Sequence, residues 1–248
     1  MALPTLLRQR YSVEASAARA LLGLSPREQV REAVMDFVCL NGVPGDWLEF
    51  GCYRGDSIIH AYWAMSAWVH QNQPRTDLAR VWPAMDGRRA YKATQQAIGA
   101  MRFVAFDSFV GLPTPTQPEE ALFAQGDYAC TRAEMEANLR TNAVDLARVA
   151  VVEGFFADTL NQKTVDDFGL KQACVVHVDC DLYEPAAAVL EFVVPLLGDG
   201  TVILFDDWDL YRGHPDRGEQ RAFGEWRQRH PHIRVSPFKS NNTFIVHG

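Results

Sequence analysis

The feature that most constrains the fold of this chain is a pair of short, largely apolar runs that end in acidic residues. The runs are residues 174–178, which lead into Asp179 and Asp181, and residues 201–205, which lead into Asp206 and Asp207. Continuous apolar runs of this length are typical of strands buried on both faces, as in parallel sheets. Adjacent carboxylates at a buried strand end repel each other and lose hydration, so they usually need a cation or a shared proton.

Strand-like segments alternate with helical patterns along the chain. Two capping boxes, Ser25-Pro26-Arg27-Glu28 and Thr131-Arg132-Ala133-Glu134, predict helices over about 26–40 and 131–140. Further helices are expected from Asp56 onward, over about 184–196 and over about 217–228. The expected strands are residues 46–50, 102–106, 149–152, 173–179 and 201–205, followed by a terminal hairpin of 232–236 and 242–246.

This alternation predicts an α/β fold, specifically a Rossmann-like, doubly wound, mostly parallel seven-stranded sheet with an antiparallel C-terminal hairpin. We expect one domain over residues 1–248, because the sequence has no repeat, low-complexity tract or interdomain linker. Residues 1–42 are expected to form an N-terminal helical lid or cap region. The polar, weakly patterned residues 71–100 are a possible insertion.

Composition narrows the classes of function. The net charge of −7 argues against nucleic acid as a main partner, because phosphate binding needs a basic face. The five cysteines show no C-x-x-C spacing and sit partly in apolar runs, which favours buried thiols in a reducing compartment. The N-terminus lacks the pattern of a signal peptide, and the apolar run 189–197 is too short to cross a bilayer. We therefore expect a cytoplasmic protein that does not bind membranes.

Acidic residues or glycines follow every expected parallel strand, at the sheet edge where such folds bind ligands. Residues 49–57 join a strand to a helix with glycines and free N–H groups, although a plain turn is an equal interpretation. Their spacing is not G-x-G-x-x-G, which disfavours a dinucleotide. Asp107 lies where a carboxylate can accept both hydroxyls of a ribose, the alternative being a turn or helix cap.

Asp179, Asp206 and Asp207 form the strongest constellation of candidate ligands. Neighbouring strands lie about 4.8 Å apart, so carboxylates at their ends can meet on one cation if the two strands pair. An all-oxygen set favours Mg²⁺ over zinc, and the alternative is a solvated pair that caps the next helix. His177 is interpreted as a core residue, and His214 either lines an acceptor site or is a solvated loop residue.

Five segments of the chain, taken in order, resemble the macrocin O-methyltransferase family, a metal-dependent branch of the class I S-adenosylmethionine methyltransferases. The most specific are D-S-F-x-G-L-P in residues 107–113 and D-x-D-L-Y-E in residues 179–184. The chain departs from the pattern at Cys180, where glycine is expected, and at Trp208, where tyrosine is usual. The other three segments are residues 45–55, 153–160 and 206–208.

The resemblance implies an O-methyltransferase that uses S-adenosylmethionine and Mg²⁺ and acts on a sugar hydroxyl of a glycosylated natural product or glycan, as in antibiotic biosynthesis. It also implies a homodimer. Asp179 is expected to accept the proton of the hydroxyl, with Asp181 as the alternative base. The implied ligands of Mg²⁺ are Asp179, Asp206 and Asp207. The implied cofactor-binding residues are Glu49, Gly51, Tyr53, Ser57, Asp107, Ser108, Gly154 and Phe155.

Three alternative functions stay open from the sequence. The first is an O-methyltransferase of the same fold that acts on a catechol-like or other vicinal diol, because metal chelation of adjacent hydroxyls serves both acceptors. The second is a dinucleotide-dependent oxidoreductase, against which the missing G-x-G-x-x-G counts. The third is a non-catalytic binding protein, although three converging acids are of little use to such a module.

Overall fold

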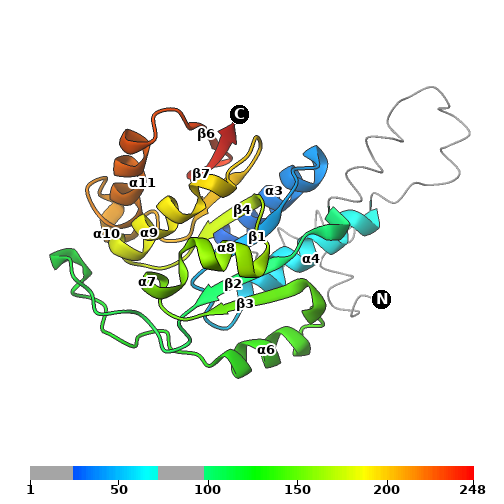
Figure 1. Cartoon of the computed structure of the whole chain (residues 1–248), viewed down its shortest axis with the longest axis horizontal. Helices are drawn as coiled ribbons and strands as arrows, with labels where there is room; N and C mark the ends of the chain where they lie inside the picture. Colours follow the sequence, from blue (N-terminus) through cyan, green and yellow to red (C-terminus); the bar gives the residue numbers. More distant parts are fainter. Residues whose placement is uncertain (1–24, 72–97) are drawn as a thin grey trace, which may run out of the picture.

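The computed structural model describes residues 25–71 and 98–248 of the chain. A seven-stranded sheet with the order β3-β2-β1-β4-β5-β7-β6 runs through its centre (Figure 1). The first five strands are parallel, whereas β7 runs antiparallel to both β5 and β6. The predicted fold class, including the C-terminal hairpin, is therefore confirmed. The strands are β1 (Asp46–Phe50), β2 (Phe103–Asp107), β3 (Val149–Glu153), β4 (Ala173–Val178), β5 (Val202–Phe205), β6 (Arg234–Phe238) and β7 (Ser240–His247).

Helices cover both faces of the sheet (Figure 1). One layer consists of α3 (Pro26–Asn41), α4 (Asp56–Gln71) and α6 (Arg132–Thr141). The other consists of α7 (Phe156–Thr159), α8 (Gln162–Phe168), α9 (Tyr183–Val193) and α11 (Gly218–Arg229). The remaining elements are the short helix α10 (Leu210–Gly213) and the single 3-10 turns η2 (Pro118–Glu120), η3 (Leu146–Arg148) and η4 (Val194–Leu196).

Side chains alternate between the two layers along each strand, as the period of a β-strand requires. On β1, Trp47 packs on the layer of α3 and α4, and Leu48 packs on the layer of α9 and α11. Strands β4 and β5 are buried along their whole length, as their continuous apolar runs predict. Glu49 of β1 and His177 of β4 are register partners and fully buried, which leaves two polar side chains inside the sheet.

The capping boxes form as predicted. The Ser25 hydroxyl accepts the Glu28 N–H at 3.3 Å, and the Glu28 carboxylate accepts the Ser25 N–H at 2.9 Å. The same reciprocal pair links Thr131 and Glu134 at the start of α6. These contacts satisfy N–H groups that would otherwise lack a partner in the first helical turn. They fix the starting residue of α3, the helix whose first two turns reach the end of β5.

Some boundaries differ from those predicted. The helix expected to reach residue 196 ends at Val193 and continues as the 3-10 turn η4, because Pro195 has no N–H to donate. The short helices α7, α8 and α10 were not predicted, since four to seven residues carry too little periodicity. Residues 1–24 of the expected cap and 72–97 of the expected insertion lie outside the described residues. No helix among those described has both the length and the apolar character needed to cross a membrane.

Gly51 directly follows β1 at the ligand-binding edge and lies against the backbone that follows β4. Its N–H donates to the Phe106 carbonyl at 2.9 Å, and its φ is +89°. A Cβ at this position would lie 1.8 Å from the backbone oxygen of Asp179, well inside van der Waals contact. The position therefore requires glycine both for its backbone angle and for the space.

Gly51→Ala is expected to lower the free energy of unfolding by roughly 2–4 kcal/mol, because strain at a positive φ adds to a backbone clash. Urea denaturation checks this result. Gly224→Ala in α11 is the matched control, since its Cβ would meet no atom within 4 Å. Replacement of that helical glycine should raise stability by about 0.5–1 kcal/mol. Equal stabilities for the two variants would contradict the interpretation.

Candidate functional site

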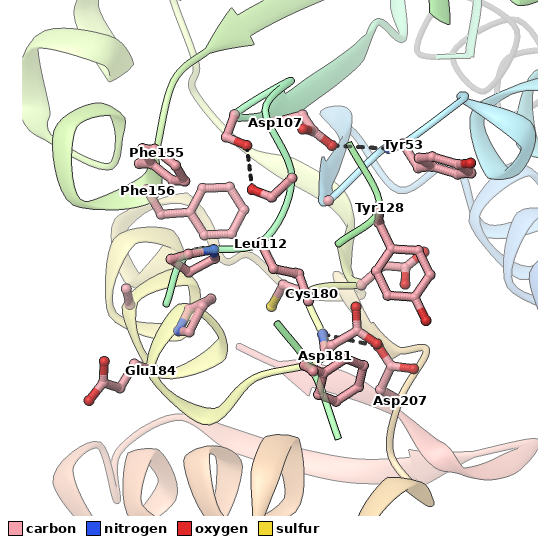
Figure 2. Close-up of a pocket in the computed structure, with 18 of the residues that line it drawn as sticks. Tyr53, Asp107, Leu112, Tyr128, Phe155, Phe156, Cys180, Asp181, Glu184 and Asp207 are labelled. Carbon is pink, nitrogen blue, oxygen red and sulfur yellow. Dashed lines mark hydrogen bonds between the residues drawn. The ribbon is translucent and has the colours of Figure 1, made fainter. Parts of the chain in front are cut away.

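A cavity of about 940 Å³ opens at the carboxyl ends of the parallel strands. Its walls come from the loops after β1, β2, β3, β4 and β5, and from residues 111–128, which cross over it. Figure 2 shows Asp107 and Tyr53 at one end of this cavity, and Asp181 with Asp207 at the other. The volume lies near the upper end of the range for small-molecule sites. The cavity therefore has two chemically different ends within one enclosure.

Asp107 organises the first end. Its Oδ2 accepts the backbone N–H groups of Cys52 at 2.7 Å and Tyr53 at 3.0 Å, and its Oδ1 accepts the Phe109 N–H at 2.7 Å. The carboxylate thus ties the loop after β1 to the loop after β2. Oδ2 accepts two of these N–H groups and Oδ1 accepts one, so Oδ1 has an acceptor direction left at the cavity that Asp107 lines.

The other residues predicted at this end have separate roles. Ser108 donates to the Gly111 carbonyl at 2.8 Å and accepts the Val110 N–H at 3.2 Å, which closes the turn after β2. Gly154 has a φ of +138° and donates its N–H to the Asp107 carbonyl at 2.9 Å, so it holds two loops together. Phe155 lines the cavity wall together with Phe156 (Figure 2).

Glu49 and Ser57 lie in the buried layer beneath the cavity. The Glu49 carboxylate accepts hydrogen bonds from the Ser57 hydroxyl and, at 2.8 Å, from Trp47 Nε1. It also lies 3.2 Å from His177 Nδ1 and is fully shielded from solvent. Tyr53, by contrast, faces the cavity and is half-exposed, with its ring 6.1 Å from that of Tyr128. The structure therefore brings Glu49 and Ser57 together. Of these three residues, Tyr53 is the one that lines the cavity.

The acidic end forms because the strands β4 and β5 end at the same level. Val178 pairs with Phe205, and the Asp206 N–H donates to the Val178 carbonyl at 2.9 Å. The two acidic segments therefore meet, as the sequence predicts, and the Asp181 N–H donates to Asp207 Oδ2 at 3.1 Å. The residues that line this end of the cavity are Asp179, Asp181, Asp206 and Asp207.

Glu219 of α11 is a further carboxylate that sequence reasoning missed. It is fully buried, and its Oε2 accepts the Asp207 N–H at 3.0 Å, while its Oε1 has no hydrogen-bond partner. Burial raises the pKa of Glu219 well above its usual value, and the charges of Asp207 and Asp179 add to the effect. Its position in an ordinary helical pattern, 12 residues after Asp207, gave no signal of this contact.

The pKa values of these carboxylates shift in different directions. Burial and neighbouring carboxylates raise some of them, and contacts with positively charged groups lower that of Asp206. Burial raises the pKa of Asp179 well above its usual value, and the neighbouring charge of Asp206 adds to this shift. Burial also raises the pKa of Asp181 to about 7, with further contributions from Asp207 and Asp206. For Asp206 burial acts in the same direction, but contacts with His177 and two arginines outweigh it and lower the pKa to about 2.

The two arginines come from α3. Arg27 Nη1 lies 2.5 Å from Asp206 Oδ2, and Arg31 Nη1 lies 3.0 Å from Asp206 Oδ1. Arg27 Nη2 also lies 3.7 Å from Asp207 Oδ1. The sequence predicted the helix but not these contacts, since nothing in a capping box indicates which strand end the helix meets. The arginines supply part of the positive charge that the carboxylates need.

One group of possible metal ligands stands out among the described residues. A ligand atom from each of His177, Asp179 and Asp206 lies within 4.8 Å of the others. Burial lowers the pKa of His177, but contacts with Asp206 and Glu49 outweigh burial and raise it to about 10. A protonated imidazole does not coordinate a cation, so the oxygen atoms are the better donors. Asp207, which follows Asp206 in the sequence, is outside this group and stays a predicted ligand.

The donor chemistry of this end fits a hard divalent cation. Its donors are carboxylate oxygens, which Mg²⁺ prefers. Burial and mutual repulsion raise the pKa values of Asp179 and Asp181, so a bound cation would stabilise their charged forms. Cys180 lies between two of these aspartates in sequence and lines the same cavity (Figure 2). Burial raises the pKa of its thiol well above the usual value, so it is not a competing soft ligand. His214 does not line the cavity and is exposed.

Comparison with known proteins gives a consistent result. Residues 88–231, more than half of the chain, match the family described as Macrocin-O-methyltransferase (TylF). The 8-demethyl-8-(2,3-dimethoxy-alpha-L-rhamnosyl)-tetracenomycin-C 4'-O-methyltransferase of Streptomyces olivaceus is 26% identical over 202 residues, which cover 79% of this chain and 64% of that protein. The demethyldecarbamoylnovobiocin O-methyltransferase of Streptomyces niveus is 26% identical over 198 residues, covering 77% of this chain and 63% of its own length. The chain thus spans less than two thirds of both curated relatives.

The fold also matches solved structures. The O-methyltransferase NovP superposes with a TM-score of 0.64 at 19% sequence identity, over 89% of this chain and 79% of NovP. A likeness at this level of identity concerns the fold. It agrees with the sheet order and the C-terminal hairpin described above.

In the presence of chelator, the melting temperature of the protein is expected to fall by roughly 5 °C between pH 5.5 and pH 8. Folding raises the pKa of Asp181 from 3.8 to about 7, so the folded state binds more protons in this window and stability falls as pH rises. Folding raises the pKa of His177 from 6.5 to about 10, and that stabilisation is complete below pH 6.5 and is lost toward pH 10. The contribution of Asp206 is complete above pH 3.8 and stays constant here.

Differential scanning calorimetry across this pH range is the measurement. Asp181→Asn removes one of these titrations and is expected to flatten the slope. A melting temperature that is constant or rises from pH 5.5 to pH 8 in the unmutated protein would contradict these protonation states.

Proposed function

The chain belongs to the macrocin O-methyltransferase family, and on that premise we propose that it transfers the methyl group of S-adenosylmethionine to a sugar hydroxyl of a glycosylated natural product. The observation that carries the proposal is one cavity with a glycine- and Asp107-lined end and a carboxylate-rich end. The names of two relatives support it, one of which specifies 4'-O-methylation of a rhamnosyl-tetracenomycin. The small glycosylated acceptor, the homodimer and the cytoplasmic location all stay predictions.

The donor would bind at the Asp107 end. Asp107 is held by three backbone N–H groups and would offer the remaining acceptor direction of Oδ1 to a ribose hydroxyl. Phe155 provides an apolar wall for the adenine. Gly51 lets the backbone approach the methionine part without a side chain in the way, and Tyr53 and Ser108 line the same region.

Glu49, Ser57 and Gly154 would support the donor from the layer behind it. The buried Glu49 carboxylate holds Ser57, the second residue of α4, and so fixes the loop that carries Gly51. Gly154 fixes the Asp107 carbonyl through its N–H. Rigid support of this kind keeps reacting groups aligned, and small misalignments are costly for rate.

Asp179, Asp206 and Asp207 would hold Mg²⁺ at the other end. Bound there, the cation would lower the pKa of an acceptor hydroxyl and fix its orientation. The apolar side chains of Leu112, Phe123 and Phe155 line the space between the two ends and reduce access of water. The residues of this chain thus bind both partners, align them for an in-line displacement and exclude water from the donor.

The acceptor hydroxyl must lose a proton during transfer, and we assign Asp179 as the base. A carboxylate with a raised pKa is a better proton acceptor near neutral pH. Asp181 is the alternative, since its pKa of about 7 is matched to that task and its backbone is held by the Tyr211 hydroxyl at 2.9 Å. Turnover measurements on both variants separate these assignments.

A catechol-like or other vicinal diol is the second candidate acceptor. Phe123 and Tyr128 line the cavity with their ring centres 6.5 Å apart, and the buried Tyr211 ring lies 6.4 Å from that of Phe123. These rings suit a flat aromatic diol as well as the face of a sugar. A panel of glycosides and catechols with S-adenosylmethionine, followed by mass spectrometry, would distinguish the two.

Calorimetry with S-adenosylhomocysteine is the first experiment, with and without Mg²⁺. We expect binding in both conditions with a dissociation constant on the order of micromolar, as is usual for enzyme ligands. A glycoside acceptor is expected to be methylated with Mg²⁺ and not in excess chelator. Absence of S-adenosylhomocysteine binding in both conditions would contradict the proposal and favour the oxidoreductase or non-catalytic alternatives.

Asp179→Asn is expected to lower kcat by at least about 100-fold, because loss of a general base costs 10²–10⁴ in rate. The affinity for S-adenosylhomocysteine should change less than about threefold, since the proposed donor contacts are made by Asp107, Phe155 and the Gly51 backbone and not by the Asp179 carboxylate. Asp181→Asn tests the alternative base in the same assay. Asp216→Asn, on an exposed residue away from the cavity, is the control. Unchanged kcat in Asp179→Asn with a large loss in Asp181→Asn would reassign the base.

A further inference from the structure

Arg27 and Arg31 lie one helical turn apart on α3 and point to the same carboxylate. Their environments differ, because the side chain of Arg27 is 59% exposed and that of Arg31 is 12% exposed. Arg31 is therefore held within the fold by its surroundings. Arg27 is held mainly by its contacts with the aspartates, and an exposed arginine that loses such contacts regains side-chain freedom and hydration.

Each side-chain oxygen of the acidic pair after β5 faces one donor or cation in the described structure. Asp206 Oδ1 faces Arg31 Nη1 at 3.0 Å, and Asp206 Oδ2 faces Arg27 Nη1 at 2.5 Å. Asp207 Oδ1 faces Arg27 Nη2 at 3.7 Å, and Asp207 Oδ2 accepts the Asp181 N–H at 3.1 Å. The Arg27 guanidinium thus bridges the two adjacent aspartates that the proposed function assigns to a divalent cation.

A divalent cation that coordinates both aspartates would lie close to these donors and would repel the positively charged ones, Arg27 and Arg31. The Asp181 N–H belongs to the backbone, and Arg31 is largely buried. Arg27 is the donor that can leave at the lowest cost, because its exposed side chain returns to water. The space next to it is suitable, since Arg27 also lines a second cavity of about 480 Å³ beside Val30, Trp208 and Asn241.

We infer that Arg27 is a built-in counter-ion that competes with the divalent cation for Asp206 and Asp207, so that cation binding releases the first turn of α3 from the end of β5. The inference rests on the proposed function, from which it takes the metal ligands. Both cavities are lined by Arg27 together with Asp206, Asp207 and Leu210. Departure of the Arg27 side chain would therefore open a passage between the two cavities, next to the predicted acceptor position.

Competition of this kind makes a quantitative prediction for metal affinity. Calorimetric titration of the full chain with Mn²⁺, used as a probe for Mg²⁺, is expected to show binding about tenfold tighter in Arg27→Gln than in the unmutated protein, within the usual range of coupling between two sites. Arg140→Gln is the matched control, since Arg140 is a similarly exposed arginine in an ion pair on α6. Its affinity for Mn²⁺ should equal that of the unmutated protein.

A second measurement separates direct competition from a general effect of charge. Hydrogen exchange of the backbone amides in residues 27–31 is expected to accelerate when Mn²⁺ binds the unmutated protein, because the Arg27 contacts that dock this turn are lost. In Arg27→Gln these amides should exchange fast without Mn²⁺, and Mn²⁺ should change them little. Slower or unchanged exchange in the unmutated protein on binding Mn²⁺ would overturn the inference.

The remaining outcomes are distinguishable from failure of the proposed function. Equal or weaker Mn²⁺ affinity in Arg27→Gln overturns the role of Arg27 even if methyl transfer proceeds. Absence of Mn²⁺ binding in every variant, with S-adenosylhomocysteine still bound, overturns the inference and the metal assignment but leaves the methyl donor site. Absence of both ligands contradicts the proposed function itself.

Discussion

Repulsion among buried carboxylates at the ends of β4 and β5 is the constraint on which the rest of the site depends. The register that pairs Val178 with Phe205 brings the two acidic segments level, so their charges meet in a region with little water. Concentrated like charge of this kind is costly unless protons, cations or hydrogen bonds offset it. The described structure offsets it with all three, which explains why groups on α3, β1, β4 and α11 converge on one edge of the sheet.

The same requirement connects the two ends of the cavity through the interior of the sheet. His177 on β4 lies between Glu49 on β1 and Asp206 after β5, and Glu49 in turn holds Ser57 at the start of α4. Buried polar side chains therefore lie beneath the cavity from the start of α4 to the acidic end, with His177 Nε2 3.8 Å from Asp206 Oδ1. Loss of one of these partners is costly, because buried polar groups have no water to compensate for it.

Sequence patterns were sufficient for the sheet, for both capping boxes and for the meeting of the acidic segments, because these depend on local periodicity and on the rule that parallel strands end at one edge. They were not sufficient for Arg27, Arg31 or Glu219, whose contacts depend on how helices dock. The sequence also did not indicate how deeply each predicted side chain would be buried. Glu49 and Ser57 stay predicted cofactor-binding residues, and both are buried outside the cavity lining, since alternation along β1 turns Glu49 toward α4.

The cysteines of the chain share one property that follows from this arrangement. All five are buried and unpaired, and burial raises the pKa of each thiol. Cys180 is the informative case, because it lines the cavity and yet has acidic neighbours that disfavour its thiolate. Only the thiolate attacks electrophiles and peroxides. If the cavity handles an alkylating sulfonium, as the proposed function requires, burial and the neighbouring acids would protect this sulfur atom from alkylation, and self-methylation at that position would be suppressed.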